Sequence, residues 1–124
     1  MNWRNERLKS TFFNEISSIV SKREELKEIV FFTLTDVDVA DEGKTLYVYV
    51  SIFEENESDK DLKTKKLFQR LGELSREFKS ELRSRIRTKF VPEIVFKMDT
   101  TPERASRIED IFKKIETENN DEKP

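Results

Sequence analysis

The spacing of apolar residues predicts an alternation of helices and strands along this chain. An amphipathic helix is predicted over residues 4–23, where apolar side chains recur every three or four positions. Its apolar positions are Leu8, Phe12, Ile16, Ile19 and Val20. The following run, residues 29–39, is rich in β-branched and aromatic residues, and its alternation changes parity near Thr35 and Asp36. These features predict a long strand with a bulge at that point.

A hairpin and a long helix are expected next. Residues 41–44 form a turn in which Gly43 can adopt a positive φ, and strict alternation from Leu46 to Ile52 predicts the second strand. Ser58 and Asp59 can then cap a helix that extends towards residue 89. Its apolar positions are Leu67, Leu71, Leu74, Phe78, Leu82 and Ile86.

The last part of the chain predicts a third strand and a final helix. Residues 90–99 form the strand, with Pro92 at its beginning, and Thr101 caps a helix with apolar positions between Ala105 and Ile115. One α+β domain over residues 4–115 follows, with a three-stranded sheet covered by helices on one face. Residues 116–124 are expected to be an acidic, disordered tail.

Composition narrows the possible functions. The chain has no cysteine and no histidine, which removes thiol nucleophiles, thiolate metal sites and the commonest general base. No catalytic constellation is present, so a protein without enzymatic activity, metal or cofactor is expected. The chain also lacks an apolar run of membrane-spanning length or a signal peptide, so a cytoplasmic monomer without membrane contact is expected.

Charge is distributed unevenly. Residues 60–90 contain eleven basic and four acidic side chains, a net charge of +7, whereas the remainder of the chain carries −9 of the total of −2. At 100° per residue, Arg76, Lys79, Arg83 and Arg87 lie within about 80° of one another on a helix. Lys65 and Gly72 join that side if the helix is continuous. Such a row of cations suits the spacing of phosphates, so the segment is predicted to bind RNA.

The predicted RNA-binding residues are Lys65, Lys66, Arg70, Arg76, Lys79, Arg83, Arg85, Arg87 and Lys89. The alternative is a solvated helix face on which Glu73, Glu77 and Glu81 form ion pairs with these cations.

Two other groups of residues admit a functional interpretation. Carboxylates gather near the hairpin turn, where a hard cation is one possibility and ordinary surface acids are the interpretation we favour. They are Asp36, Asp38, Asp41 and Glu42. Aromatic side chains on the hairpin are expected mainly in the core, with base stacking on an open sheet face as the alternative. They are Phe31, Phe32, Tyr47, Tyr49 and Phe53.

Three stretches together resemble the ribosome-binding factor A family, bacterial maturation factors of the small ribosomal subunit. They are the hairpin strands Thr33–Val39 and Leu46–Ser51, the run Arg87–Asp99 with its Pro-Glu-Ile, Phe and Asp, and the segment Thr101–Phe112. With the first helix, the resemblance covers about residues 5–115. It implies a KH-like domain of the second type that binds the free 30S subunit and its precursor 16S rRNA, with a role in late rRNA processing, maturation and cold adaptation.

The family's signature kink, an Ala-x-Gly between two central helices, is altered here. The matching position is Leu74-Ser75-Arg76, and Gly72 lies two residues earlier. The resemblance therefore predicts two helical pieces that meet near residues 72–76. A protein-interaction module whose basic helix docks an acidic partner is the alternative function, and a hydrolase that uses the aspartates ranks far behind.

Overall fold

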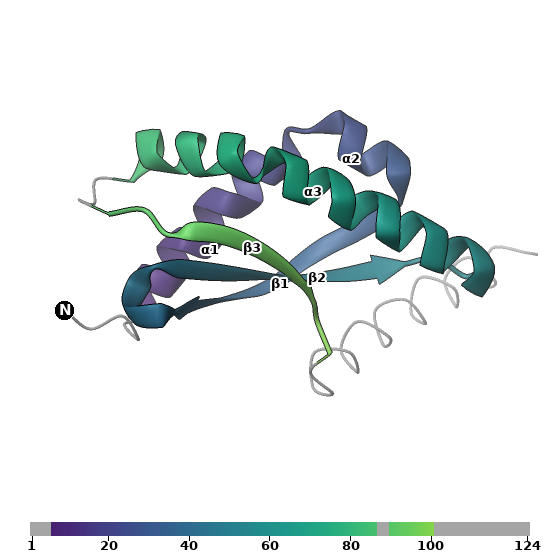
Figure 1. The fold of residues 1–124 in the computed structure, drawn as a ribbon, viewed down its shortest axis with the longest axis horizontal. Helices are drawn as coiled ribbons and strands as arrows, with labels where there is room; N and C mark the ends of the chain where they lie inside the picture. Colours follow the sequence, from purple (N-terminus) through teal and green to yellow (C-terminus); the bar gives the residue numbers. More distant parts are fainter. Residues whose placement is uncertain (1–5, 87–89, 101–124) are drawn as a thin grey trace, which may run out of the picture.

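The computed structural model describes residues 6–86 and 90–100 of the chain. Over these residues the chain forms three α-helices and three strands, two helices followed by a ββαβ arrangement (Figure 1). In chain order they are α1 (Glu6–Ser21), α2 (Glu24–Ile29), β1 (Phe31–Ala40), the short 3-10 turn η1 (Asp41–Gly43), β2 (Thr45–Phe53), α3 (Glu57–Arg85) and β3 (Glu93–Met98). The helix predicted from Thr101 and the predicted tail lie outside the described residues.

The strands form one mixed sheet in the order β1-β2-β3. β1 and β2 pair antiparallel, and β2 and β3 pair parallel, so the chain must cross over the sheet between them and does so through α3. The register shifts between Leu34 and Asp36, which confirms the predicted bulge. Gly43 has a φ of 90°, as the turn required.

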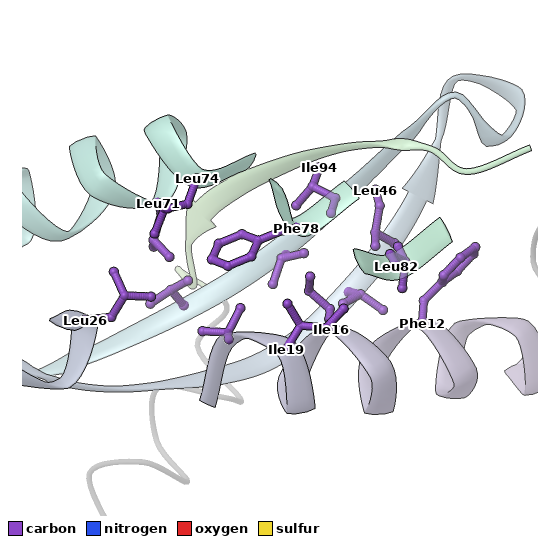
Figure 2. Packing of buried hydrophobic residues seen from close by; sticks show 14 of the residues in the cluster. Phe12, Ile16, Ile19, Leu26, Leu46, Leu71, Leu74, Phe78, Leu82 and Ile94 are labelled. Atoms are coloured by element: carbon purple, nitrogen blue, oxygen red, sulfur yellow. The ribbon is translucent and has the colours of Figure 1, made fainter. Parts of the chain in front are cut away.

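A single core lies between the inner face of the sheet and the helices (Figure 2). Alternate residues of β2, from Leu46 to Ile52, are buried, and they meet apolar side chains of all three helices. Phe78 of α3 is fully buried and packs edge-on against Phe96 of β3, with ring centroids 5.9 Å apart. Because its apolar stripe is held in this core, α3 presents its opposite, polar side to solvent. The predicted α+β fold with helices on one face is confirmed.

Helix α2 was not predicted. The sequence indicated a charged connection followed by a strand beginning at Ile29, but residues 24–29 are helical and β1 begins at Phe31. Leu26 is fully buried in the core, and Glu24 and Glu25 occupy the first turn, where the helix dipole favours acids. Residues 24–28 contain no β-branched side chain, and glutamate, leucine and lysine favour a helix.

The predicted division of the basic segment into two helical pieces is not seen in the backbone of α3. α3 is one α-helix from Glu57 to Arg85, so Gly72, Leu74, Ser75 and Arg76 lie inside it and join no separate pieces. The Ser75 hydroxyl donates to the carbonyl of Leu71 one turn earlier, within that helix. The apolar stripe from Leu67 to Leu82 is buried without interruption, and no proline removes a backbone donor from the helix. Packing along the whole stripe keeps the helix in one piece.

Candidate nucleic-acid interface

Helix α3 begins with a side-chain cap that the sequence analysis assigned to the wrong residue. The Asn56 side chain accepts hydrogen bonds from the backbone N–H groups of Ser58 and Asp59, at 3.0 and 3.3 Å. Asparagine is among the preferred N-cap residues, so the signal was present in the sequence two positions before Ser58. The cap sets where the helix starts and therefore which side chains face the solvent.

A continuous α3 brings Lys65, Gly72 and three later cations into one row. The three cations are Arg76, Lys79 and Arg83. At 100° per residue these five positions lie within about 60° of one another, and from Lys65 to Arg83 they extend over about 27 Å of the helix. Lys79 is half-buried and the other four residues are exposed. We refer to these five residues as the basic row.

Glu93 lies beside the basic row. Its carboxylate accepts a hydrogen bond from the Lys79 ammonium group across the junction between β3 and α3. This bond, the charge of Lys79 and the nearby charges of Arg76 and Arg83 hold the pKa of Glu93 below its ordinary value of 4.5. The sequence analysis identified Glu93 only as part of a strand motif. Its partnership with α3 depends on how β3 packs, so no local signal revealed it.

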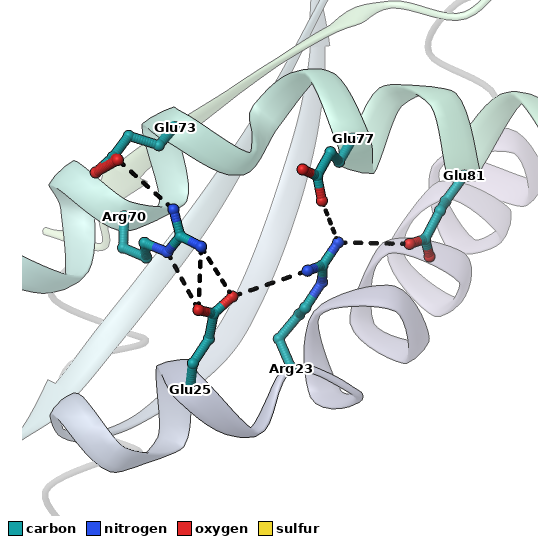
Figure 3. A network of polar contacts seen from close by, with 6 residues as sticks. All are labelled: Arg23, Glu25, Arg70, Glu73, Glu77 and Glu81. Carbon is teal, nitrogen blue, oxygen red and sulfur yellow. Dashed lines mark hydrogen bonds and ion pairs between the residues drawn. The ribbon is translucent and has the colours of Figure 1, made fainter.

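Besides Lys79, two further predicted RNA-binding residues are occupied in ion pairs within the protein. Arg70 donates to both carboxylate oxygens of Glu25, at 3.1 to 3.3 Å, and also pairs with Glu73 (Figure 3). The hydrogen bonds that Arg70 donates to Glu25 raise the pKa of Arg70 above its ordinary value. Arg85 contacts Glu15 at 3.4 Å and the Ser18 hydroxyl at 3.0 Å. Both arginines hold α3 to its neighbouring helices.

The acids of α3 were expected to pair with its own basic side chains, but most of them have a different partner. Arg23, in the link between α1 and α2, pairs with Glu77 and Glu81 of α3 (Figure 3). With Glu73 engaged by Arg70, three acids of α3 are paired with arginines. Of the ion pairs that this alternative expected, the described residues show the one between Arg70 and Glu73, whereas Glu77 and Glu81 pair with an arginine outside the predicted set.

The remaining predicted residues divide into two groups. Within residues 6–86 and 90–100, Lys65, Lys66, Arg76 and Arg83 form no ion pair with another side chain. Arg87 and Lys89 lie outside the described residues. The structure thus brings together four of the nine predicted cations with Gly72, and it separates Arg70 and Arg85 from them.

The hairpin aromatics lie mostly on the outer face of the sheet, contrary to the expectation that they fill the core. Phe32 packs against the core, but Phe31 is 68% exposed and stands 5.2 Å from the ring of its strand partner Phe53. The Lys97 ammonium group lies 3.9 Å above the ring of Tyr47. The register explains this arrangement, because these residues alternate with the buried ones along β1 and β2.

The carboxylates of the hairpin do not form a metal site. Lys9 of α1 pairs with both Asp36 and Asp38, at 3.5 and 3.3 Å. Over the described part of the chain, no group of three or more acidic side chains is arranged to hold a metal ion. No described helix is long and apolar enough to span a membrane.

Sequence comparison identifies relatives along almost the whole chain. The family model described as "Ribosome-binding factor A" matches residues 4–112. A ribosome-binding factor A of Desulfitobacterium hafniense is 36% identical over 117 residues, which cover 93% of this chain and 88% of that protein. The protein of the same name in Coprothermobacter proteolyticus is 32% identical over 117 residues, 91% of this chain and 81% of its own length.

Solved structures agree in fold. The crystal structure of ribosome-binding factor A from Thermus thermophilus has a TM-score of 0.60 at 19% identity and covers 78% of this chain and 98% of its own. A Thermus thermophilus homology model fitted into a map of a complex with the 30S subunit has a TM-score of 0.57 at 22% identity, covering 73% and 90%. The shared architecture is KH-like. On the strength of the family match and the curated relatives, this chain belongs to the ribosome-binding factor A family.

Proposed function

We propose that this protein binds the free 30S subunit and its precursor 16S rRNA through the basic row of α3, and assists late processing and maturation. The observation that carries the proposal is the placement of Lys65, Arg76, Lys79 and Arg83 on one solvent-facing side of an unbroken helix. The protein outside residues 60–90 is acidic, so this row is the surface to which a polyanion is drawn. The Thermus thermophilus relative has been fitted into the map of a 30S complex, which supports the same partner.

The proposed function requires the protein to hold rRNA phosphates in fixed positions. Arginine guanidinium groups donate in a fork to phosphate oxygens, and each phosphate neutralised releases condensed counterions. A helix buried along one side supplies a rigid base, so the cations keep a fixed spacing. The protein holds one rRNA segment in a single conformation, and no bond is made or broken. Lys66, Arg87 and Lys89 extend the contact in this proposal.

The direct test is co-sedimentation with purified free small subunits at several salt concentrations. The wild-type protein is compared with a triple variant, Arg76→Gln, Lys79→Gln and Arg83→Gln, and with a charge-matched control, Lys22→Gln, Lys27→Gln and Lys44→Gln. We expect the first triple variant to lose affinity. The slope of log K against log salt concentration should become shallower by about two to three units, since each phosphate contact contributes about one. Equal losses in both triples would refute the assigned face.

Ribonuclease treatment separates RNA binding from the alternative protein-interaction module. Complexes formed through rRNA phosphates are lost on digestion, whereas docking of an acidic protein partner survives it. The maturation role is tested in cells that lack the protein: precursor 16S rRNA accumulates, and more strongly at low temperature. Normal processing at all temperatures would restrict the function to binding.

A further inference from the structure

We infer that Gly72 is the point at which the RNA backbone approaches α3 most closely, an inference that rests on the proposed RNA-binding function. Glycine inside a helix costs about 1 kcal/mol relative to alanine, so its presence calls for a local reason. The two usual reasons are a kink and close packing of a neighbouring element. At Gly72 no neighbouring element packs closely, and the helix is not interrupted.

Gly72 has no internal packing role. α3 is unbroken from Glu57 to Arg85, and its backbone needs no positive φ at this position. A Cβ atom built on Gly72 would meet no atom within 4 Å, so no part of the described protein requires the space. The residue is exposed and points into solvent. The bare helix surface is therefore available to a partner from outside.

The position of Gly72 in the basic row indicates what that partner is. Lys65 precedes it by about 10 Å along the helix, and Arg76 follows it by about 6 Å, all on the same side. Between these two cations, the side of the helix centred on Gly72 carries no charge of its own, and Glu73 lies about 100° around the axis. A phosphate chain that contacts both Lys65 and Arg76 along this side of the helix passes over Gly72. Without a side chain there, ribose and phosphate groups can rest on the helix backbone.

This geometry favours RNA over an apolar protein surface. The edges of the gap are cationic, with Lys65 before it and Arg76 after it, and both side chains are exposed. Gly72 thus acts as a steric specificity residue of the interface. It contributes room, while Arg76 and Lys65 contribute charge.

The test enlarges Gly72 without altering charge. Gly72→Ala and Gly72→Gln are compared with Ser80→Gln, which introduces the same glutamine side chain at an exposed position of α3 about 80° from Gly72. Both Gly72 variants are expected to melt at a higher temperature, because alanine and glutamine favour helix, which shows that they fold. Affinity for free small subunits and for deproteinised 16S rRNA is then measured.

We expect Gly72→Gln to bind both probes about tenfold or more weakly, Gly72→Ala to fall between it and the wild type, and Ser80→Gln to bind normally. Wild-type affinity in Gly72→Gln would overturn the inference. A loss on small subunits without a loss on the deproteinised RNA would assign the contact to a ribosomal protein and also overturn it. Failure of the wild-type protein to bind either probe would refute the proposed function itself and is distinguished by that comparison.

Discussion

The Lys79 ammonium group of α3 is held by the Glu93 carboxylate at the start of β3. The lysine is largely buried, with 22% of its side chain exposed, whereas 70% of the glutamate side chain faces solvent. Arg76 and Arg83 act on the same carboxylate from the two sides of Lys79. An acid therefore occupies the middle of the surface proposed to bind phosphate, where it competes with RNA for Lys79.

Removal of that acid should strengthen binding. Glu93→Gln keeps the size of the side chain, frees Lys79 and removes the negative charge on which Arg76 and Arg83 act. We expect a higher affinity for small subunits at low salt and a salt dependence steeper by about one unit of slope. Glu28→Gln, an exposed acid of α2, is the control for total charge and should have little effect. Weaker binding in Glu93→Gln would show that the carboxylate is needed to position Lys79.

The Lys79–Glu93 pair should also make the stability of the folded protein depend on pH, in a direction that its pKa shift determines. The pKa of Glu93 is lowered in the folded protein, chiefly by the hydrogen bond from Lys79. The ionised Glu93 carboxylate therefore contributes its full stabilisation above the ordinary pKa of 4.5. This stabilisation is lost as the pH falls through the lower pKa that Glu93 has in the folded protein. We expect the wild type to melt slightly above Glu93→Gln at neutral pH, with the difference closing below about pH 4. A difference that persists down to about pH 2 would contradict this assignment.

Arg70 should behave as a structural residue although the sequence placed it among the RNA contacts. It joins Glu25 of α2 to Glu73 of α3. Arg70→Gln is expected to increase amide hydrogen exchange in α2 a few-fold while lowering affinity for small subunits less than Arg76→Gln does. Glu25→Gln should increase the exchange similarly, and the double variant should add little. Equal affinity losses for Arg70→Gln and Arg76→Gln would show that Arg70 also belongs to the RNA-binding surface.

Replacement of a buried and of an exposed phenylalanine should lower the free energy of unfolding by different amounts. Phe78→Ala removes a fully buried ring that packs against Phe96 and should cost about 3–5 kcal/mol of unfolding free energy. Phe31→Ala removes an exposed ring whose described aromatic neighbour is Phe53, and about 1 kcal/mol is expected. Denaturant unfolding monitored by circular dichroism measures both. Comparable losses would mean that the outer face of the sheet is covered in solution.

Much of the fold was determined by the sequence itself. The bulge between Leu34 and Asp36 follows from a change in alternation parity, and the apolar stripe of α3 follows from spacing of three and four residues. Both are periodic signals, and they depend only on which side of an element each residue faces. The family resemblance rested on the hairpin, the run through Pro92 and Glu93, and the segment that follows it.

Tertiary structure decided which cations are available. Lys79 and Arg70 look alike in the sequence, yet one meets Glu93 and the other meets Glu25, because β3 and α2 pack on different sides of α3. The same packing kept α3 in one piece, and it placed Gly72 on the exposed side. Periodicity assigns a residue to one side of an element, but the neighbour it meets depends on distant segments that only the folded chain brings together.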